Sequence, residues 1–147
     1  MGLLGAAPVA HADNTRLNNS VVTNIYTLQH QAGCTNDVKK KPPLQLAAEW
    51  HANDVLNNRA LDGDLGSDGS TPQDRARAAG YHGTVAQTVA INPALAINGI
   101  EILRQWYYNP ATYAIMSDCG HTEIGVWSVN GLDRSVVVAV YGRPATD

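Results

Sequence analysis

The 147-residue sequence lacks several features that would point to a function at once. It has no excess of positive charge, because 10 Lys and Arg stand against 13 Asp and Glu, whereas a nucleic-acid-binding domain needs a basic face. No segment approaches the roughly 20 apolar residues that span a bilayer. The Gly-x-Ser-x-Gly turn of serine hydrolases does not occur, and the histidines are not spaced like metal ligands. We therefore expect no nucleic-acid partner and no transmembrane segment.

The composition itself is that of a folded domain. Hydrophobic residues make up 44% of the chain and charged residues 16%, proportions that are ordinary for a globular protein and unlike those of a disordered one. A chain of this length suits one domain with enough residues to bury a core. No internal repeat or low-complexity linker divides the sequence. We predict a single domain over residues 13–147.

The first 12 residues look like the remains of an export signal. Residues 3–10 form a short apolar stretch, and Ala10-His11-Ala12 fits the small-x-small pattern of a cleavage site. No basic segment precedes the apolar stretch, so an apolar tail is the alternative interpretation. We predict that residues 1–12 are a signal remnant and that the protein is secreted or belongs to the cell envelope.

Cys34 and Cys119 are the only cysteines in the chain. In an exported protein an even number of cysteines usually forms disulfides, so we predict a bond between these two. Closing so long a loop stabilises a fold by roughly 4–5 kcal/mol in the chain-entropy description. The alternative is a reactive thiol or a metal ligand, which is supported only by the position of His30 four residues before Cys34 on one helix face.

Hydrophobic periodicity predicts most of the helices. Over residues 14–31, apolar side chains recur every three or four positions, which places them on one face of a helix. A second helix is predicted over residues 44–61, with Ala47, Trp50, Val55 and Leu56 among its buried positions. Further helices are expected over residues 72–79, 92–108 and 110–116, with Asn92-Pro93 and Asn109-Pro110 as the starts of the last two.

Residues 66–75 combine turn and helix-start signals. Gly66 and Gly69 permit backbone angles that a side chain disfavours. Thr71 is a suitable N-cap for a helix whose first residue is Pro72, and Asp74 then lies in the first turn, where the helix dipole favours a negative charge. We therefore expect this segment to position a helix, so that its primary role is structural.

The C-terminal part of the chain predicts a β-hairpin. Residues 122–129 and 134–141 are strand-like, and Asn130-Gly131 between them is a strong hairpin-turn signal. Residues 136–140 are apolar without alternation, which suits a central strand that is covered on both faces. A third strand is predicted over residues 84–91. The order of elements indicates a sheet between helical layers.

Four segments, taken in order, resemble the CAP superfamily (cysteine-rich secretory proteins, antigen 5 and pathogenesis-related proteins). They are residues 44–52, with the pattern Leu…Ala-x-x-His-Ala, residues 66–81, residues 106–110 and residues 124–126. The resemblance covers residues 14–142 and is strongest to secreted CAP-domain proteins of mycobacteria and other actinobacteria. It implies an α+β fold, a three-layer α/β/α sandwich with a small, largely antiparallel central sheet.

The same resemblance implies a cleft whose usual metal ligands have been lost. Many CAP domains hold a divalent metal with two histidines and two glutamates, and the aligned positions here are Asp64, Gln87, Asn109 and Thr112. Only Asp64 is ionisable, and an amide cannot replace a carboxylate as a charged ligand or general base. We therefore expect the four residues to cluster in a cleft with no metal, no cofactor and no standard catalytic residues.

An aromatic group is expected at the edge of that cleft, formed by Trp106, Tyr107, Tyr108 and Tyr113. These side chains either pack in the core or form the wall of a site for an apolar ligand. Our leading hypothesis is an exported, non-enzymatic protein that binds a small apolar ligand, such as a lipid, or an extracellular protein. The alternatives are a hydrolase with a non-standard cleft centred on Asp64 and a purely extracellular interaction module.

Overall fold

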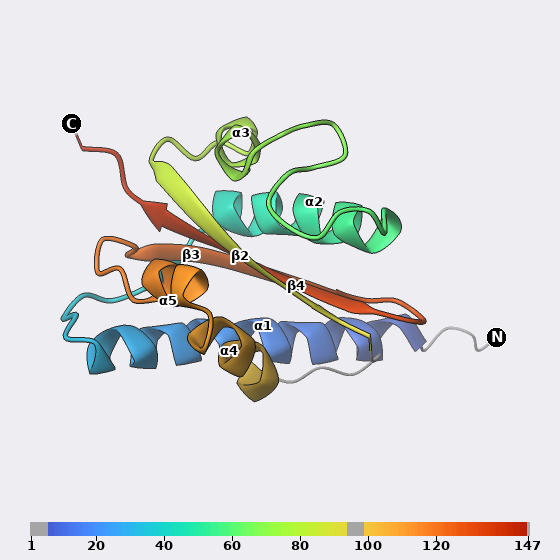
Figure 1. The fold of residues 1–147 in the computed structure, drawn as a ribbon, viewed down its shortest axis with the longest axis horizontal. Helices are drawn as coiled ribbons and strands as arrows, with labels where there is room; N and C mark the ends of the chain where they lie inside the picture. The colour runs from blue at the N-terminus through green and yellow to red at the C-terminus, as the bar shows by residue number, and fades with distance from the viewer. Residues whose placement is uncertain (1–5, 94–98, 147) are drawn as a thin grey trace.

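The computed structural model describes residues 6–93 and 99–146 and shows a sheet between two layers of helices (Figure 1). Helices α2 and α3 cover one face of the sheet, and α1, α4 and α5 cover the other. This arrangement confirms the predicted α+β sandwich. In chain order the elements are α1 (Ala6–Gln31), β1 (Lys39–Lys40), α2 (Pro42–Asn57), α3 (Pro72–Ala78), β2 (Thr84–Asn92), α4 (Gly99–Tyr107), α5 (Pro110–Met116), β3 (Glu123–Asn130) and β4 (Ser135–Arg143).

The sheet has the strand order β1-β3-β4-β2. Strand β4 is antiparallel to both of its neighbours, and only the short β1 is parallel to β3. Val137 and Ala139 face the core under α1, whereas Val136, Val138 and Val140 face the core under α2. All five are completely buried. The apolar run without alternation therefore did identify a central strand covered on both faces.

Helix α1 begins at Ala6 and has 26 residues, so it starts eight positions before the predicted Asn14. Pro8 does not prevent this, because it lies in the first turn, where the backbone N–H groups have no partner within the helix. The expected apolar face is present: Val21, Ile25 and Leu28 are buried. The boundary between a signal remnant and the domain stays a prediction.

Helix α2 differs from its prediction in its end and in one of its buried residues. It ends at Asn57, not at residue 61. Its buried residues are Leu44, Ala47, Ala48, His51, Ala52 and Val55. Trp50 does not lie on that face, and 41% of its surface is exposed. The prediction that Trp50 is buried was therefore wrong, because its hydrophobic character was given more weight than its position on the helix.

The helix start predicted at Asn92 was wrong, and the hairpin predicted at Asn130-Gly131 is present with a loop that begins one residue later. Asn92 is the last residue of β2 and pairs with Ser135, so it does not cap a helix; the next described helix, α4, begins at Gly99. Asn130 is likewise the last residue of β3, and residues 131–134 form the hairpin loop, closed by a bond from the Gly131 N–H to the Arg134 carbonyl. In both cases continued strand pairing prevails over the local turn signal.

The segment before α3 follows its prediction closely. The Thr71 hydroxyl accepts a hydrogen bond from the Asp74 N–H, and the Asp74 carboxylate accepts one from the Thr71 N–H, so that the two form a capping box. Gly69 has a φ of +82°, which side chains rarely adopt. A Cβ on Gly66 would lie 2.7 Å from the Ser70 hydroxyl oxygen. Here the local sequence determines the local structure.

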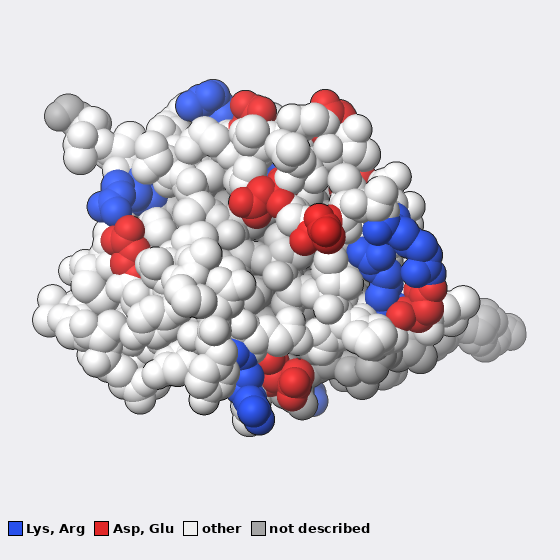
Figure 2. All heavy atoms as spheres, in the orientation of Figure 1, with Lys and Arg blue, Asp and Glu red and all other residues white. Residues whose placement is uncertain are grey.

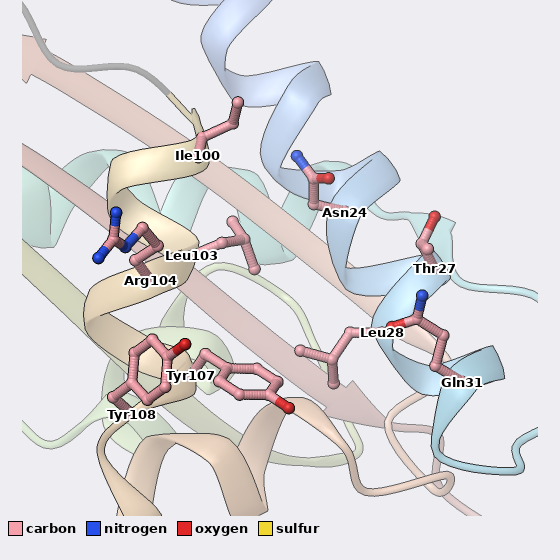
Figure 3. A pocket seen from close by; sticks show the side chains of 9 residues that line it. All are labelled: Asn24, Thr27, Leu28, Gln31, Ile100, Leu103, Arg104, Tyr107 and Tyr108. Carbon is pink, nitrogen blue, oxygen red and sulfur yellow. The ribbon is translucent and has the colours of Figure 1, made fainter.

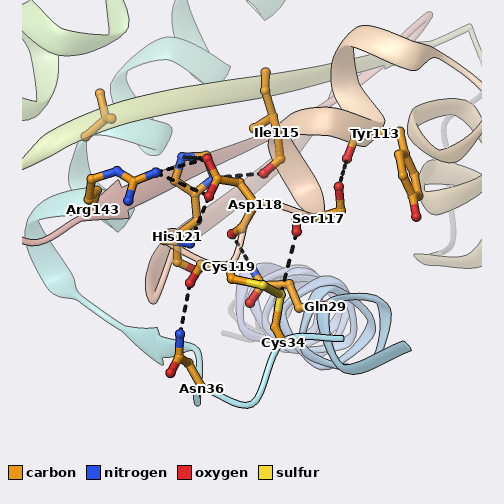
Figure 4. A network of polar contacts seen from close by, with 12 residues as sticks. Gln29, Cys34, Asn36, Tyr113, Ile115, Ser117, Asp118, Cys119, His121 and Arg143 are labelled. Carbon is orange, nitrogen blue, oxygen red and sulfur yellow. Dashed lines mark hydrogen bonds and ion pairs between the residues drawn. A yellow bond between two sulfur atoms is a disulfide. The ribbon is translucent and has the colours of Figure 1, made fainter. Parts of the chain in front are cut away.

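The predicted disulfide joins Cys34 and Cys119, whose Cα atoms are 5.3 Å apart (Figure 4). It ties the segment after α1 to the loop before β3. Polar contacts reinforce the same edge: the buried Gln29 amide donates to the His121 carbonyl at 3.1 Å, and Arg143 pairs with Asp118 at 3.0 Å. One end of the α1 layer is thus fixed covalently as well as by packing.

Among residues 6–93 and 99–146, no helix is both long enough and apolar enough to cross a membrane.

Candidate functional site

The structure brings together two of the four residues that the CAP resemblance placed in a cleft. The Gln87 amide donates to the Asp64 carboxylate at 3.1 Å. Gln87 is buried on β2, whereas Asp64 is exposed in the loop after α2. A third residue, Arg75 on α3, contacts both of them. Its guanidinium donates to the Asp64 carbonyl at 2.7 Å and to the Gln87 side-chain oxygen at 3.3 Å.

Arg75 also links this pair to Ser70, in the loop before α3. Its Nη1 donates to the Ser70 carbonyl at 2.9 Å and to the Ser70 hydroxyl at 3.0 Å. The side chain is only 7% exposed, and burial lowers the pKa of the guanidinium, although the nearby Asp64 opposes this shift. An arginine remains charged in a protein even so. A buried cation next to Asp64 and Gln87 disfavours a metal ion at the same place.

His51 lies in the same region, on the buried face of α2. Its Nε2–H donates to the Gly63 carbonyl at 2.7 Å, and burial lowers the pKa of the imidazole below its usual 6.5. The ring is therefore neutral at physiological pH and holds the start of the loop that carries Asp64. Its Nδ1 is buried and, among the described residues, has no hydrogen-bond partner.

The other two aligned residues, Asn109 and Thr112, organise the connection between α4 and α5. The Asn109 side chain caps α5 by accepting from the Ala111 N–H at 2.9 Å, and the Thr112 hydroxyl donates to the Trp106 carbonyl at 2.6 Å. In the described part of the chain, neither side chain is hydrogen-bonded to Asp64 or Gln87. A single cleft that contains all four residues stays a prediction.

The described residues contain no group of three or more His, Cys, Asp or Glu side chains that could hold a metal ion. Asp64, the one ionisable residue at the aligned positions, has an amide and a guanidinium as its neighbours. This geometry does not suit a divalent cation, which requires several anionic or imidazole ligands.

The four aromatic residues divide into two kinds. Trp106 belongs to the core, and its indole N–H donates to the Val89 carbonyl at 3.2 Å. Tyr113 is half-buried and packs edge-on against Tyr107, with ring centroids 5.2 Å apart. Tyr107 and Tyr108 are exposed by 49% and 75%. One part of this group thus packs in the core and the other part lies at the surface; that the exposed part forms the wall of a ligand site stays a prediction.

The exposed tyrosines line a groove between α1 and α4, which we call the α1–α4 groove (Figure 3). It encloses about 380 Å³, a volume within the range of small-molecule sites. Helix α4 contributes its apolar and aromatic residues, and α1 contributes a buried leucine and a polar margin. The lining residues are Asn24, Thr27, Leu28, Gln31, Ile100, Leu103, Arg104, Tyr107 and Tyr108.

Of the residues that line this groove, only the tyrosines were predicted from the sequence. The remaining residues lie on two helices whose contact no local motif reveals. One signal was available, because the predicted helix over residues 92–108 is apolar on more than half of its circumference, which is more than one sheet face covers. Ile100 is 72% exposed because it lies on the part of this apolar surface that the sheet does not cover.

Solved structures of extracellular and surface proteins share this fold. An extracellular protein containing an SCP domain, from Bacillus anthracis, aligns with 97% of this chain and 45% of its own, with a TM-score of 0.78 and 14% identity. The chain has the SCP/CAP fold. An outer surface protein from Borrelia burgdorferi aligns over 85% of this chain and 90% of its own (TM-score 0.72, 16% identity).

A cysteine-rich secretory protein from Staphylococcus aureus also shares the SCP/CAP fold, over 88% of this chain and 39% of its own (TM-score 0.64, 12% identity). The chain thus spans less than half the length of two of these three proteins. No family model matches the sequence, and no curated protein matches it. The similarity accordingly concerns the fold, and the function has to be argued from the residues of this chain.

Proposed function

We propose that this protein is an exported, non-enzymatic binding protein that holds a single-chain lipid of the fatty-acid type in the α1–α4 groove. The observation that carries the proposal is the exposed apolar lining of the groove. Ile100 and Tyr108 are more than two-thirds exposed, and Tyr107 beside them is half exposed. Apolar side chains gathered around a hollow on a soluble domain are typical of a ligand site.

The base of the groove favours an apolar chain as the ligand. Leu28 is buried, and the half-buried Leu103 packs against the same core as Leu28. In Figure 3 both point into the space between the two helices. A hydrocarbon chain laid there would contact the edge of the core and remove apolar surface from water, at about 25 cal/mol per Å².

Arg104 supports a ligand with a carboxylate head group. Its side chain is exposed at the groove and, among the described residues, forms no ion pair. A guanidinium binds a carboxylate through two parallel hydrogen bonds. The polar residues Asn24, Thr27 and Gln31 on α1 provide further hydrogen-bonding groups at the opposite margin.

Export is supported by two independent observations. The disulfide between Cys34 and Cys119 is of the kind that persists in oxidising compartments. The solved structures that share the fold include an extracellular protein and an outer surface protein. We therefore include in the proposal that the protein is secreted or attached to the cell envelope. The resemblance to actinobacterial proteins stays a prediction from the sequence.

The alternative of a hydrolase centred on Asp64 has less support. The Asp64 carboxylate accepts a hydrogen bond from an amide, and the nearby Ser70 hydroxyl is bonded to Arg75. A nucleophilic serine needs a base within hydrogen-bonding distance, and a cationic guanidinium cannot act as one.

The proposal is tested by titrating the protein with cis-parinaric acid, a fluorescent fatty acid. We expect saturable binding that Ile100→Asp weakens by at least about tenfold, because a charge would lie against the hydrocarbon chain. Leu132→Asp is the matched control, since Leu132 is 94% exposed on the hairpin loop. Arg104→Gln should weaken binding of the acid but not of the corresponding alcohol. Equal binding by the wild type and Ile100→Asp would contradict the proposal.

A further inference from the structure

A second hollow, which we call the polar hollow, lies on the opposite side of the sheet from the α1–α4 groove. It is formed between α2 and the 66–70 segment and encloses about 440 Å³. Its lining contains a tryptophan, three asparagines, two aspartates, two serines and an arginine, and no aliphatic side chain. None of these residues takes part in the lipid site proposed above. A hollow of this size with this lining points to a polar ligand.

Helix α2 presents one face to the polar hollow. Trp50, Asn53, Asp54 and Asn57 follow one another at spacings of three, one and three, which places them on one side of a helix. The core-facing residues of α2 occupy the other side. Trp50 is thus exposed because it belongs to the outer face, where its indole ring borders the polar hollow.

The amides of Asn53 and Asn57 are available for a ligand. Both side chains are exposed and, within the described residues, neither is engaged in a hydrogen bond. Each amide offers two donors and one acceptor. Together they provide a row of bifunctional polar groups beside the indole ring of Trp50.

The opposite wall of the polar hollow is already fixed in place. The Asp54 carboxylate accepts hydrogen bonds from the Ser67 N–H and the Ser67 hydroxyl, both at 2.8 Å. Gly66 allows the segment to fold back on itself toward Ser70. Arg75 also lines the hollow, and its buried Nε has no partner among the described groups. A wall held in this way needs little reorganisation when a ligand binds.

The residue types restrict the class of ligand. Asp54 and Asp68 outnumber Arg75, whose guanidinium is already bonded to Ser70, Asp64 and Gln87, and therefore disfavour an anion. The lack of aliphatic lining disfavours a lipid. A pyranose ring has an apolar C–H face that suits an aromatic ring, and a rim of hydroxyl groups that both donate and accept hydrogen bonds, as amides and carboxylates require. We propose that the polar hollow binds an uncharged saccharide, which stacks on Trp50 and is hydrogen-bonded by Asn53, Asp54 and Asn57.

A β-linked chain of glucose or N-acetylglucosamine is the most suitable probe, because equatorial substituents leave both faces of each ring flat. The test is calorimetric titration of the protein with cellotetraose and with tetra-N-acetylchitotetraose. We expect at least one of them to bind with a Kd on the order of 0.1–1 mM. Trp50→Ala should weaken this binding by at least about tenfold, and Asn57→Ala by about three- to fivefold.

Tyr108→Ala is the matched control, because it removes an exposed aromatic ring from the α1–α4 groove and should leave saccharide binding unchanged. Trp50 and Asn57 lie on the exposed side of α2, so the variants should melt close to the wild type. Two results would overturn the proposal: no binding of either tetrasaccharide at about 10 mM, or undiminished binding by Trp50→Ala. Neither result bears on lipid binding in the α1–α4 groove.

Discussion

The two helical layers of this protein share one sheet but present different chemistry to the solvent. The layer of α1, α4 and α5 exposes isoleucine and tyrosine around the α1–α4 groove. The layer of α2 and α3 exposes asparagine, aspartate and serine around the polar hollow, with Trp50 as its one aromatic residue. Figure 2 shows charges of both signs scattered over one face of the molecule without a broad patch of either sign.

This difference arises outside the core. Alternate residues of β4 serve both layers: Val137, Ala139 and Tyr141 face the α1 layer, and Val136, Val138 and Val140 face the α2 layer. The layers differ in how they are held: the α1 layer is fixed at one end by a disulfide, whereas the α2 layer relies on small residues in its core and on hydrogen bonds around Arg75. On the two proposals made above, one sheet supports two binding chemistries, and each layer has its own means of stabilisation.

The largest effect is expected from removing the disulfide. Cys34 and Cys119 are separated by 85 positions, and the double variant to serine should lower the free energy of unfolding by about 4 kcal/mol, because the unfolded chain regains the freedom of that loop. Urea unfolding at equilibrium measures this loss. A change of less than about 1 kcal/mol would show that packing alone holds the α1 layer.

The corresponding test of the α2 layer is Arg75→Met. This substitution keeps an unbranched apolar side chain but removes the guanidinium donors that satisfy the Asp64 and Ser70 carbonyls and the Gln87 amide oxygen. We expect a loss of about 3 kcal/mol in urea unfolding. Arg77→Met, at an exposed position of the same helix, should cost no more than about 0.5 kcal/mol. Equal costs would mean that Arg75 does not organise the loop.

A smaller effect is expected from pH, and again it belongs to the α2 layer. Burial lowers the pKa of His51 below 6.5, so the unfolded state takes up the proton more readily than the folded state. Stability is then full above pH 6.5 and falls as the pH decreases below that value, by at most about 1.4 kcal/mol per pH unit. His51→Gln should flatten this slope, and His82→Gln, at an exposed position, should preserve it. If the free energy of unfolding of His51→Gln still fell with decreasing pH, another group would be responsible for the pH dependence.

The smallest effect is expected at the cap of α3. Thr71→Ala removes the hydroxyl that accepts from the Asp74 N–H, and it should cost about 1 kcal/mol in thermal unfolding. Gly69→Val should cost more, because Gly69 has a positive φ. Thr23→Ala, exposed on α1, is the control, with a change below about 0.5 kcal/mol. If Thr71→Ala and Gly69→Val both melted at the wild-type temperature, residues 66–75 would not contribute to stability.

The sequence predicted those parts of the fold in which a local pattern and the tertiary contacts agree. The run Val136 to Val140 indicated a strand buried on both faces, and Thr71-Pro72 with Asp74 indicated a capped helix; both are present. The hairpin predicted at Asn130-Gly131 is present, although Asn130 pairs with Ser135 and the loop is residues 131–134. The prediction at Asn92 was wrong, because this residue pairs with Ser135 at the far end of the chain. Such pairing depends on a distant strand that a local turn signal does not take into account.

The candidate sites were harder to predict than the fold. Asp64 and Gln87 do meet, but the guanidinium of Arg75 contacts both of them, and its hydrogen bonds join α3 to the preceding loop and to β2. The polar hollow was missed for a different reason. Trp50 was expected in the core as a large hydrophobic residue, although its spacing from Asn53 and Asn57 indicates an outer face.

The central claim, that each layer binds its own class of ligand, is tested most directly by one amide chemical-shift map recorded with two ligands. Addition of cis-parinaric acid should shift the backbone amides of α1 and α4, Ile100 and Tyr108 included, and leave α2 unchanged. Addition of cellotetraose or tetra-N-acetylchitotetraose should shift the Trp50 indole and the Asn53 and Asn57 side-chain amides, and leave α4 unchanged. Shifts from both kinds of ligand on the same helices, or fatty-acid shifts confined to α2, would contradict the account.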